Sequence, residues 1–297
     1  MIIAPPPSAQ LNDSWPNPVE LVVRILIIGG TGLLGAELLR QASLAGHAAT
    51  GTFLSRTPTL DTCRWHRLDS RSREQVHDLM SAVRPDLVIN AGFRQHDWAS
   101  TADSAALVAI AAEEVGARMV QVSSDAVFSG TAHSYDETAV PDPITPYGAA
   151  KAAAETAVRA IAPTAVVART SLIIGPGSSH VRRVHALANG KAQGVLFTDD
   201  IRCPVDVSDL AAALLELGLA DHPGIHHVGG AEAISRYALG VLIARRDGLP
   251  VDRLTSGSRA DSETPGPIAV RLDSSWTQRR LTTRLRGAAD FLSPASQ

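Results

Sequence analysis

The chain is predicted to be an α/β protein with a doubly wound parallel sheet and a smaller C-terminal lobe, and three observations support this. Short β-branched runs alternate with longer helical patterns from residue 22 onward. The first of these runs leads into a helix through three spaced glycines. After Arg169 the segment 175–177, Gly-Pro-Gly, interrupts the alternation, and shorter elements follow it.

Strands buried on both faces of a parallel sheet are expected to be continuous apolar runs, and helices to show a longer period. On this basis the predicted strands are 22–28, 48–53, 86–90, 118–123 and 165–169, and the predicted helices are 33–45, 72–83, 100–115 and 147–161. Further along the chain we expect helices near 179–189, 208–220 and 235–246, a strand at 225–228 and a loop at 255–268. The predicted domains are a flexible N-terminal arm over 1–21, a Rossmann-type core over 22–170, and a substrate-binding lobe over 171–297 that is partly interleaved with the core.

Composition and charge exclude several classes of partner. The net charge is −3 and there is no basic stripe, so no nucleic acid is expected. The most apolar run, 21–28, is short and contains Arg24, which excludes a membrane span there. The two cysteines, Cys63 and Cys203, lack the spacing of a zinc or redox motif. We therefore expect a cytoplasmic protein with reduced thiols, no membrane partner and no metal, and a homodimer is left open.

The glycine turn predicts a dinucleotide site in the core. Gly29 permits a tight turn after the first strand, Gly32 lets the backbone approach a pyrophosphate, and Gly35 lets the helix pack close to the strand. The free N–H groups of the helix then face the phosphates. The cofactor-binding residues predicted from this segment are Gly29, Thr31, Gly32, Leu33, Leu34 and Gly35.

The end of the second strand indicates which dinucleotide binds. An NAD site usually has an acidic residue there, which bonds the ribose 2′-hydroxyl, but this chain has Ser55 and Arg56. A guanidinium suits a 2′-phosphate, so NADP(H) is preferred over NAD(H), although Arg56 could equally be a solvated loop residue. Asp69, after a further short strand, either contacts the adenine or caps the helix that follows.

Three side chains predict acid–base chemistry at the same sheet edge. Tyr147 and Lys151 are four residues apart, so one helical turn places them on the same face. An adjacent ammonium is expected to lower the pKa of the phenol, and the lysine can also hold a ribose. Ser124 ends the fifth predicted strand, where a hydroxyl can bond a substrate carbonyl.

These segments together resemble the extended short-chain dehydrogenase/reductase superfamily, and within it the dTDP-4-dehydrorhamnose reductase-like group. The resemblance covers residues 22–245, and the segments that carry it are 29–35, 85–92, 116–130, 146–151, 169–175, 204–211 and 224–230. It implies Ser124 as the catalytic hydroxyl, Tyr147 as the acid–base residue and Lys151 as the catalytic lysine. It further implies binding residues, which are Asn90, Ala91, Gly92, Tyr147 and Lys151 for the cofactor and Ser124, Asp125 and Arg202 for the substrate.

Some positions depart from the family pattern. An asparagine that supports the proton relay in this superfamily is matched here by Thr101. Related 4,6-dehydratases have an acidic pair after the catalytic hydroxyl, whereas Asp125 is followed by Ala126, which argues against dehydration. Arg202 is placed on the substrate diphosphate by the resemblance, with a surface arginine as the alternative.

Several other polar side chains were weighed as site residues. His96, Asp97 and Trp98 follow the fourth predicted strand, where they are candidates for the substrate pocket. The pair at 182–183 is a candidate for a substrate diphosphate, with a solvated helix face as the preferred interpretation. The histidines at 222, 226 and 227 are candidates for metal ligands, but we interpret them as structural, since neighbours on a strand point to opposite faces.

The resulting hypothesis is NADPH-dependent reduction of a keto group on a nucleotide-activated deoxysugar. An epimerase that recycles bound NAD uses nearly the same residues. It is the less favoured alternative, because the acidic residue typical of an NAD site is absent after the second strand. A non-catalytic, NADP-binding regulatory protein, like the regulatory subunit of methionine adenosyltransferase in the same group, is the alternative from another class.

Overall fold

A parallel β-sheet forms the centre of the computed structural model, which describes residues 22–61, 63–263 and 266–293. Within these residues the sheet has seven strands in the order β11-β6-β5-β4-β1-β2-β3, all of them parallel. Their bounds are β1 (Arg24–Ile28), β2 (Ala48–Phe53), β3 (Arg64–Arg67), β4 (Leu87–Asn90), β5 (Arg118–Ser124), β6 (Val166–Thr170) and β11 (Gly224–Val228). The predicted arm over 1–21 lies outside the described residues.

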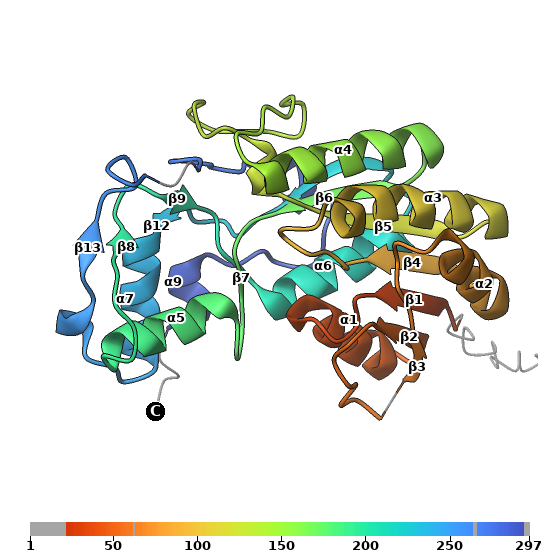
Figure 1. Cartoon of the computed structure of the whole chain (residues 1–297), viewed down its shortest axis with the longest axis horizontal. Coiled ribbons are helices and arrows are strands. Elements are labelled where there is room, and N and C mark those ends of the chain that lie inside the picture. The colour runs from red at the N-terminus through yellow and green to blue at the C-terminus, as the bar shows by residue number, and fades with distance from the viewer. Residues whose placement is uncertain (1–21, 62, 264–265, 294–297) are drawn as a thin grey trace, which may run out of the picture.

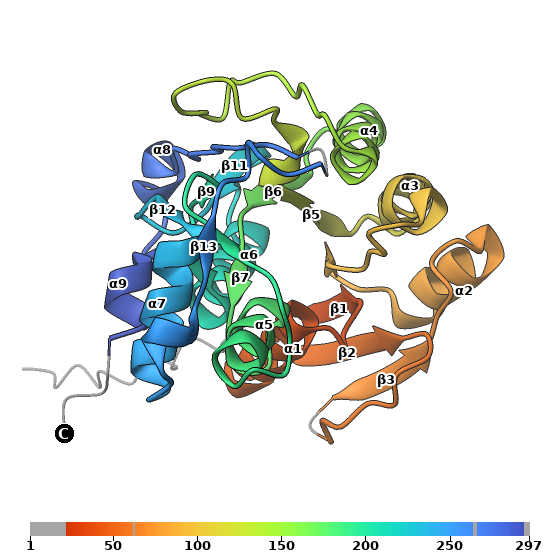
Figure 2. The same cartoon turned by 60° about the vertical axis from the view of Figure 1, so that its left-hand side comes forward.

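Helices cover both faces of this sheet, as Figures 1 and 2 show. In β1, alternate side chains enter two separate cores, with Ile25 and Ile27 on one face and Leu26 and Ile28 on the other. The first face is covered by α1 (Leu33–Leu44) and α6 (Val207–Leu219). The second is covered by α2 (Arg73–Val83), α3 (Ser104–Val115) and α4 (Pro146–Ile161). The predicted doubly wound α/β fold is confirmed.

The smaller lobe has its own apolar core and lies beside the sheet, on the left in Figure 1. Its main helices are α5 (Ser179–Ala188) and α7 (Arg236–Arg246), joined near the end of the described chain by α9 (Ala288–Phe291), whereas α8 (Ser275–Gln278) packs against β11 of the sheet. Three two-stranded ladders complete it, formed by β7 (Ile173–Ile174) with β10 (Val205–Asp206), β9 (Ile201–Arg202) with β12 (Ile234–Ser235), and β8 (Leu196–Phe197) with β13 (Ser256–Gly257). None of the helices within the described ranges is long and apolar enough to cross a membrane.

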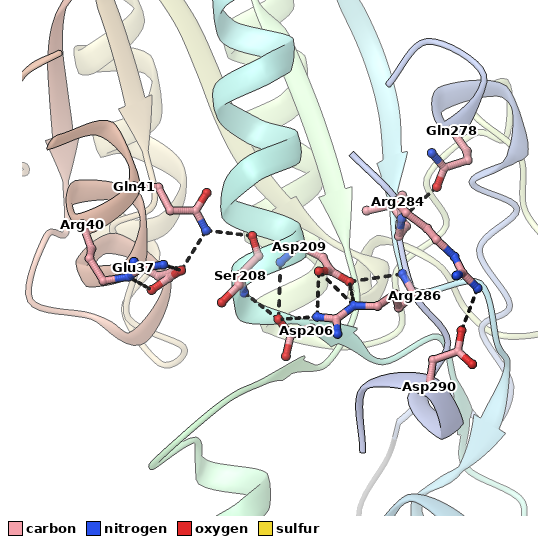
Figure 3. A network of polar contacts seen from close by, with 11 residues as sticks. Glu37, Arg40, Gln41, Asp206, Ser208, Asp209, Gln278, Arg284, Arg286 and Asp290 are labelled. Atoms are coloured by element: carbon pink, nitrogen blue, oxygen red, sulfur yellow. Dashed lines mark hydrogen bonds and ion pairs between the residues drawn. The ribbon is translucent and has the colours of Figure 1, made fainter. Parts of the chain in front are cut away.

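The chain crosses between the two parts more than once. After the first lobe elements it returns to the core with α6 and β11. Figure 3 shows the polar contacts that hold α6 in place. On one side, Gln41 of α1 donates to the carbonyl of Ser208 at 2.9 Å. On the other, Arg286 pairs with Asp206 at 3.3 Å and Asp209 at 2.9 Å. Residues that follow the smaller lobe in sequence therefore complete the contacts that hold α6 on the core.

Most predicted elements are present within two residues of their predicted bounds. One exception is the helix expected at 100–115, which begins with a π-helical turn, Ala99–Asp103, before α3. No bounds were predicted for β3, because Arg64–Arg67 is a half-exposed edge strand without an apolar run. The loop expected at 255–268 contains β13 at its start, so that prediction was wrong there. Asp69 does not cap α2, because the N-cap is Ser72.

The glycine turn between β1 and α1 depends on close backbone contact. Gly29 has a φ of +83°, and a Cβ there would lie 2.8 Å from Cα of Gly92, at the end of the neighbouring strand β4. A Cβ on Gly35 would overlap the carbonyl oxygen of Gly29 and lie 2.8 Å from Cα of Gly30. The helix can therefore begin directly against the turn only because these positions lack side chains.

The substitution Gly35→Ala tests this contact. We expect a loss of at least about 2 kcal/mol in the free energy of unfolding, because the added methyl overlaps backbone that cannot move away. Affinity for the predicted dinucleotide should fall with it, since the turn must shift. Urea denaturation and NADPH fluorescence titration measure the two effects.

Gly46→Ala is the matched control at the other end of α1. A Cβ there meets nothing within 4 Å, but φ is +80°. It should cost about 1 kcal/mol of stability for the strained backbone and leave dinucleotide affinity unchanged. Equal losses of affinity in both variants would contradict a local role for Gly35.

Candidate active site

Because the strands are parallel, the loops that carry the predicted residues all leave the sheet at one edge. Four of them follow Ile28, Phe53, Arg67 and Asn90, the last residues of β1, β2, β3 and β4. These loops enclose a cavity of about 280 Å³. Of the predicted cofactor residues, those on its wall are Gly29, Thr31, Gly32, Ser55, Arg56, Asp69, Ala91 and Gly92.

The other residues predicted from the glycine turn and β4 lie behind the cavity wall. Leu34 is buried in the core, and Leu33 packs against the same cluster. Gly35 supports the turn, as described above. The side chain of Asn90 is buried, where it donates to Gln121 at 2.9 Å and accepts the N–H of Gly92 at 3.3 Å. These residues shape the loops and do not face the cavity.

Cationic side chains line this cavity. The guanidinium of Arg56 is exposed and donates to the carbonyl of Thr31 at 3.0 Å, across the glycine turn. Arg71, which the sequence analysis missed, pairs with Asp69 at 2.7 Å. This ion pair lowers the pKa of Asp69 to about 2 and offsets its charge. Arg94, also missed, lines the same cavity.

Helix α4 brings the predicted acid–base residues to the same edge. Its N-cap is Thr145, whose hydroxyl accepts the N–H of Gly148 at 3.1 Å, and Pro146 occupies its first turn. A Cβ on Gly148 would overlap the carbonyl oxygen of Ala126, so the helix begins in direct contact with the loop after β5. This contact places Tyr147 of α4 beside Ser124 at the end of β5, at the sheet edge where the sequence predicts both side chains.

Tyr147 is half-buried, and the loss of solvent around its phenol raises its pKa. The charge of Asp125 raises this pKa further, while a hydrogen bond with Ser124 lowers it. The sequence analysis expected a lowered value, and that expectation was wrong for the site as the structure has it. The reason is geometric: Lys151 Nζ lies 5.9 Å from the centre of the Tyr147 ring, and desolvation outweighs it. Tyr147 is therefore protonated at neutral pH.

Lys151 is only 3% exposed and lies one turn after Tyr147. Its ammonium donates to the carbonyl of Val122 at 3.0 Å. Burial lowers its pKa to about 8, and the nearby carboxylate of Glu155 opposes that shift. The group is thus charged at pH 7 but close to the point where it loses its proton.

Phe93 joins the cavity to the acid–base pair, and the sequence analysis missed it. Its ring lies 5.6 Å from that of Tyr147, and Lys151 Nζ is 4.9 Å from its centre. Phe93 also lines the cavity and is 50% exposed. Its position directly after Gly92 could have indicated this role, because the loop after β4 both lines the cavity and contacts α4.

A second cavity, of about 340 Å³, lies in the smaller lobe. Its polar wall includes His180 and Arg183 of α5, Arg236 of α7, and Asp200. Arg259, whose guanidinium lies 5.2 Å from the centre of the Phe197 ring, also lines it, together with Phe197 and several aliphatic side chains. Arg183 is exposed, as expected for a solvated helix face, but it also faces this cavity. The sequence analysis did not find this site, because its residues come from segments far apart in the chain.

The predicted substrate residue Arg202 is not on the wall of either cavity. It is 5% exposed and pairs with Asp200 at 2.8 Å, so the alternative of a surface arginine was wrong. Asp125 is also buried and accepts from Ser171 at 2.6 Å.

The remaining candidates lie outside both cavities. Thr101 is buried and donates to the carbonyl of Arg94 at 2.8 Å. His96 is exposed, Asp97 approaches Arg71 at 3.4 Å, and Trp98 donates to Asp103 at 3.2 Å; the linings of the two cavities include none of them.

The neighbouring histidines of β11 are both buried. His226 approaches the carbonyl of His222 at 2.8 Å, and the ring of His227 lies 5.9 Å from that of Phe128. Among the described residues, no group of three or more potential metal ligands comes together.

Comparison with known proteins identifies the family. The profile of the RmlD substrate binding domain matches residues 23–287. The chain belongs to this family. The RmlD family, the sheet topology and the named relatives make it an NAD(P)-dependent oxidoreductase of the extended short-chain dehydrogenase/reductase type, which confirms the resemblance found in the sequence.

Curated relatives of this RmlD-family chain have several roles. A probable low-salt glycan biosynthesis reductase of Haloferax volcanii is 30% identical over 256 residues, or 80% of this chain and 85% of the relative. A dTDP-4-dehydrorhamnose reductase of Mycobacterium tuberculosis is 29% identical over 262 residues, 82% of each chain. The methionine adenosyltransferase 2 subunit beta of Xenopus tropicalis is 29% identical over 277 residues, 86% of this chain and 82% of the relative.

Solved structures share the fold. A hypothetical dTDP-4-dehydrorhamnose reductase of Sulfolobus tokodaii has a TM-score of 0.76 at 27% identity, covering 89% of this chain and 96% of its own. A dTDP-4-dehydrorhamnose reductase of Bacillus anthracis in complex with NADP has a TM-score of 0.77 at 22% identity, covering 92% and 98%. The Bordetella bronchiseptica enzyme WbmG in complex with NAD has a TM-score of 0.78 at 19% identity, covering 91% of each chain. Proteins with this fold therefore bind either dinucleotide.

The pKa of Lys151 predicts how cofactor binding depends on pH. Below about pH 8 the ammonium is charged and attracts the anionic dinucleotide, and above this value it is neutral. We expect NADPH affinity to fall as the pH rises through 8, when it is followed by fluorescence titration. Lys151→Met should bind NADPH more weakly at pH 7 and lack this step. The same step in the variant would assign the titration to another group.

Proposed function

We propose that this protein reduces a keto group on a nucleotide-activated deoxysugar, with NADPH as the hydride source. One observation carries the proposal most directly. The phenol of Tyr147 lies beside the hydroxyl of Ser124, and its ring is 5.6 Å from that of Phe93, which lines the cavity at the glycine turn. Curated relatives named as dTDP-4-dehydrorhamnose reductases support this choice of reaction.

The residues around the cavity at the glycine turn fit a dinucleotide. Gly32 is the N-cap of α1 and provides no side-chain cap, so the first N–H groups of the helix are left for an anion. The contact of Gly35 with Gly29 keeps the turn tight enough for a pyrophosphate to approach the backbone. Arg56 favours NADPH over NADH, because a guanidinium pairs with a 2′-phosphate, whereas Arg71 is already paired with Asp69.

The end of β2 supports the reductase over the NAD-dependent epimerase, which uses nearly the same residues. An NAD site usually has an acidic residue there, whereas this chain has Ser55 and Arg56 on the cavity wall.

The second cavity supports a nucleotide-linked substrate. Arg183 and Arg236 present cationic groups that suit a diphosphate, and Phe197 adds an aromatic surface for a base or sugar. The residues of the chain then act in a simple order. Ser124 Oγ, whose proton is donated to Asp125 Oδ1 in this structure, would turn that proton to the substrate carbonyl, and Tyr147 would give its proton to the oxygen as the carbonyl carbon receives the hydride that NADPH would supply. Lys151 holds the ribose and compensates charge on the phenol.

Loss of the Tyr147 hydroxyl tests the acid–base role. Tyr147→Phe should bind NADPH with unchanged affinity and oxidise it at least about a hundredfold more slowly with dTDP-4-keto-6-deoxysugars, because no other proton donor is in place. Absorbance of the nicotinamide band measures turnover. Tyr237→Phe, which removes a phenol outside both cavities, is the control and should match the wild type.

Wild-type behaviour separates the alternatives. Consumption of one NADPH per ketone reduced supports the reductase. Product formation without net consumption of cofactor identifies an epimerase. Binding of NADPH without turnover across a broad panel of keto sugars supports a regulatory protein, and no binding of NADPH or NADH contradicts the whole proposal.

The choice of NADPH is tested at Arg56. Arg56→Ser should weaken NADPH binding by about tenfold or more and change NADH binding little, since a charge-assisted hydrogen bond contributes about 1.5–3 kcal/mol. Arg67→Ser is the matched control, because Arg67 is also exposed and close by but is absent from the cavity wall. An equal loss for both dinucleotides would assign Arg56 to the pyrophosphate or to the turn.

A further inference from the structure

Arg202 is held by the protein on every side. Its guanidinium donates to three backbone carbonyls, those of Ile201 at 2.7 Å, Pro267 at 2.7 Å and Ile268 at 3.2 Å. It also lies 2.8 Å from Asp200 and 3.7 Å from Asp125. Three of the five N–H donors, two on Nη1 and one on Nη2, thus bond protein carbonyls, and Nε faces the Asp125 carboxylate, so most of this buried group is already directed at protein oxygens and not at a substrate diphosphate.

Asp125 transmits the position of Arg202 to the catalytic hydroxyl. One of its carboxylate oxygens accepts from Ser171 at 2.6 Å and faces Arg202. The other oxygen is 3.3 Å from Ser124 Oγ, which donates to it. Asp125 is 6% exposed, so it interacts strongly with the groups around it. The hydroxyl of Ser124 is therefore oriented by a carboxylate that Arg202 and Ser171 hold in place.

On its other side, Arg202 is connected to the cavity of the smaller lobe. The second oxygen of Asp200 lies 3.4 Å from Nε of Arg236, and Arg236 contacts His180 at 3.2 Å. Asp200, Arg236 and His180 all line that cavity. Charges of alternating sign thus run from the catalytic serine to the cavity wall, in the order Asp125, Arg202, Asp200 and Arg236.

The position of Asp125 explains why a cation is needed between Asp125 and Asp200. A carboxylate beside Ser124 and Tyr147 opposes the negative charge that develops on a carbonyl oxygen during reduction. Arg202 offsets that charge without touching the substrate. Without it, Asp125 and Asp200 would be two buried anions with no cation between them.

We propose that Arg202 is a positioning residue that acts through Asp125 on Ser124, and that Asp200 links this arrangement to the cavity of the smaller lobe. The proposal rests on the proposed function, because it assigns Ser124 to a keto group. It replaces the direct contact between Arg202 and a substrate diphosphate that the resemblance implied. The diphosphate contact falls instead to the cavity residues Arg183 and Arg236.

The two assignments of Arg202 differ in a measurable way, and Arg202→Lys separates them. The lysine keeps the charge but cannot reach both carboxylates and three carbonyls. We expect kcat to fall at least about tenfold, with KM for the sugar nucleotide and Kd for dTDP changed by less than about twofold. Calorimetric titration with dTDP and with UDP gives affinities independent of turnover. Arg183→Gln is the contrast: it should raise KM and these Kd values more than it lowers kcat.

Asp125→Asn tests whether Arg202 acts through this carboxylate. The amide has the same shape and can still accept from Ser171, so folding is expected to survive even if Arg202→Lys does not fold. Alone it should lower kcat without changing Kd for dTDP. Adding Arg202→Lys to it should lower kcat by less than about twofold more, because the two residues act as one unit. Melting temperature and NADPH affinity confirm folding.

A tenfold or greater loss of dTDP affinity in a folded Arg202→Lys protein would overturn the proposal and restore the diphosphate contact. Full additivity of the two substitutions in kcat would also overturn it. If the wild-type protein does not oxidise NADPH with any of the keto sugar nucleotides, the proposed function is contradicted. The dTDP titrations then still decide whether Arg202 touches the nucleotide.

Discussion

Arg169 and Glu155 form an ion pair whose side chains are only 1% and 4% exposed, and the geometry of the site depends on it. Ser123 donates to the same carboxylate at 2.5 Å. The three residues belong to β6, α4 and β5, so the pair fixes the helix that carries Lys151 against the strand that ends in Ser124. Removing one partner of a buried pair costs about 3–5 kcal/mol. This pair therefore holds the predicted catalytic residues Ser124 and Lys151 in their relative positions.

Local sequence patterns were enough to predict the sheet, the glycine turn and the stacked Tyr147 and Lys151, because each depends on residues close together in the chain. The strand β3 was harder, since Arg64–Arg67 is an edge strand whose side chains are mostly half-exposed and carry no apolar period. Asp69 was expected either to contact the adenine or to cap α2, because it comes shortly before that helix; the structure shows that Ser72 accepts the N–H of Gln75 and is the cap.

Features that depend on tertiary contacts could not be predicted in the same way. The direction of the Tyr147 pKa is set by burial between α4 and the loop after β4, which spacing alone does not report. A motif located Arg202, but its partners Pro267 and Ile268 lie in a segment expected to be only a loop. The cavity of the smaller lobe likewise joins α5 and α7 with the residues between β8 and β9.

The return of the chain to the core through α6 has a consequence for synthesis on the ribosome. Glu216 of α6 accepts hydrogen bonds from Thr282 and Thr283, at 2.5 Å and 3.0 Å from their N–H groups, and Asp209 pairs with Arg286. The dinucleotide-binding half emerges first, yet one face of its sheet is covered by a helix whose polar partners are translated about seventy residues later. A nascent chain therefore exposes an incompletely fixed core until residues 282–286 have left the exit tunnel, and chaperone contact is most valuable during that interval.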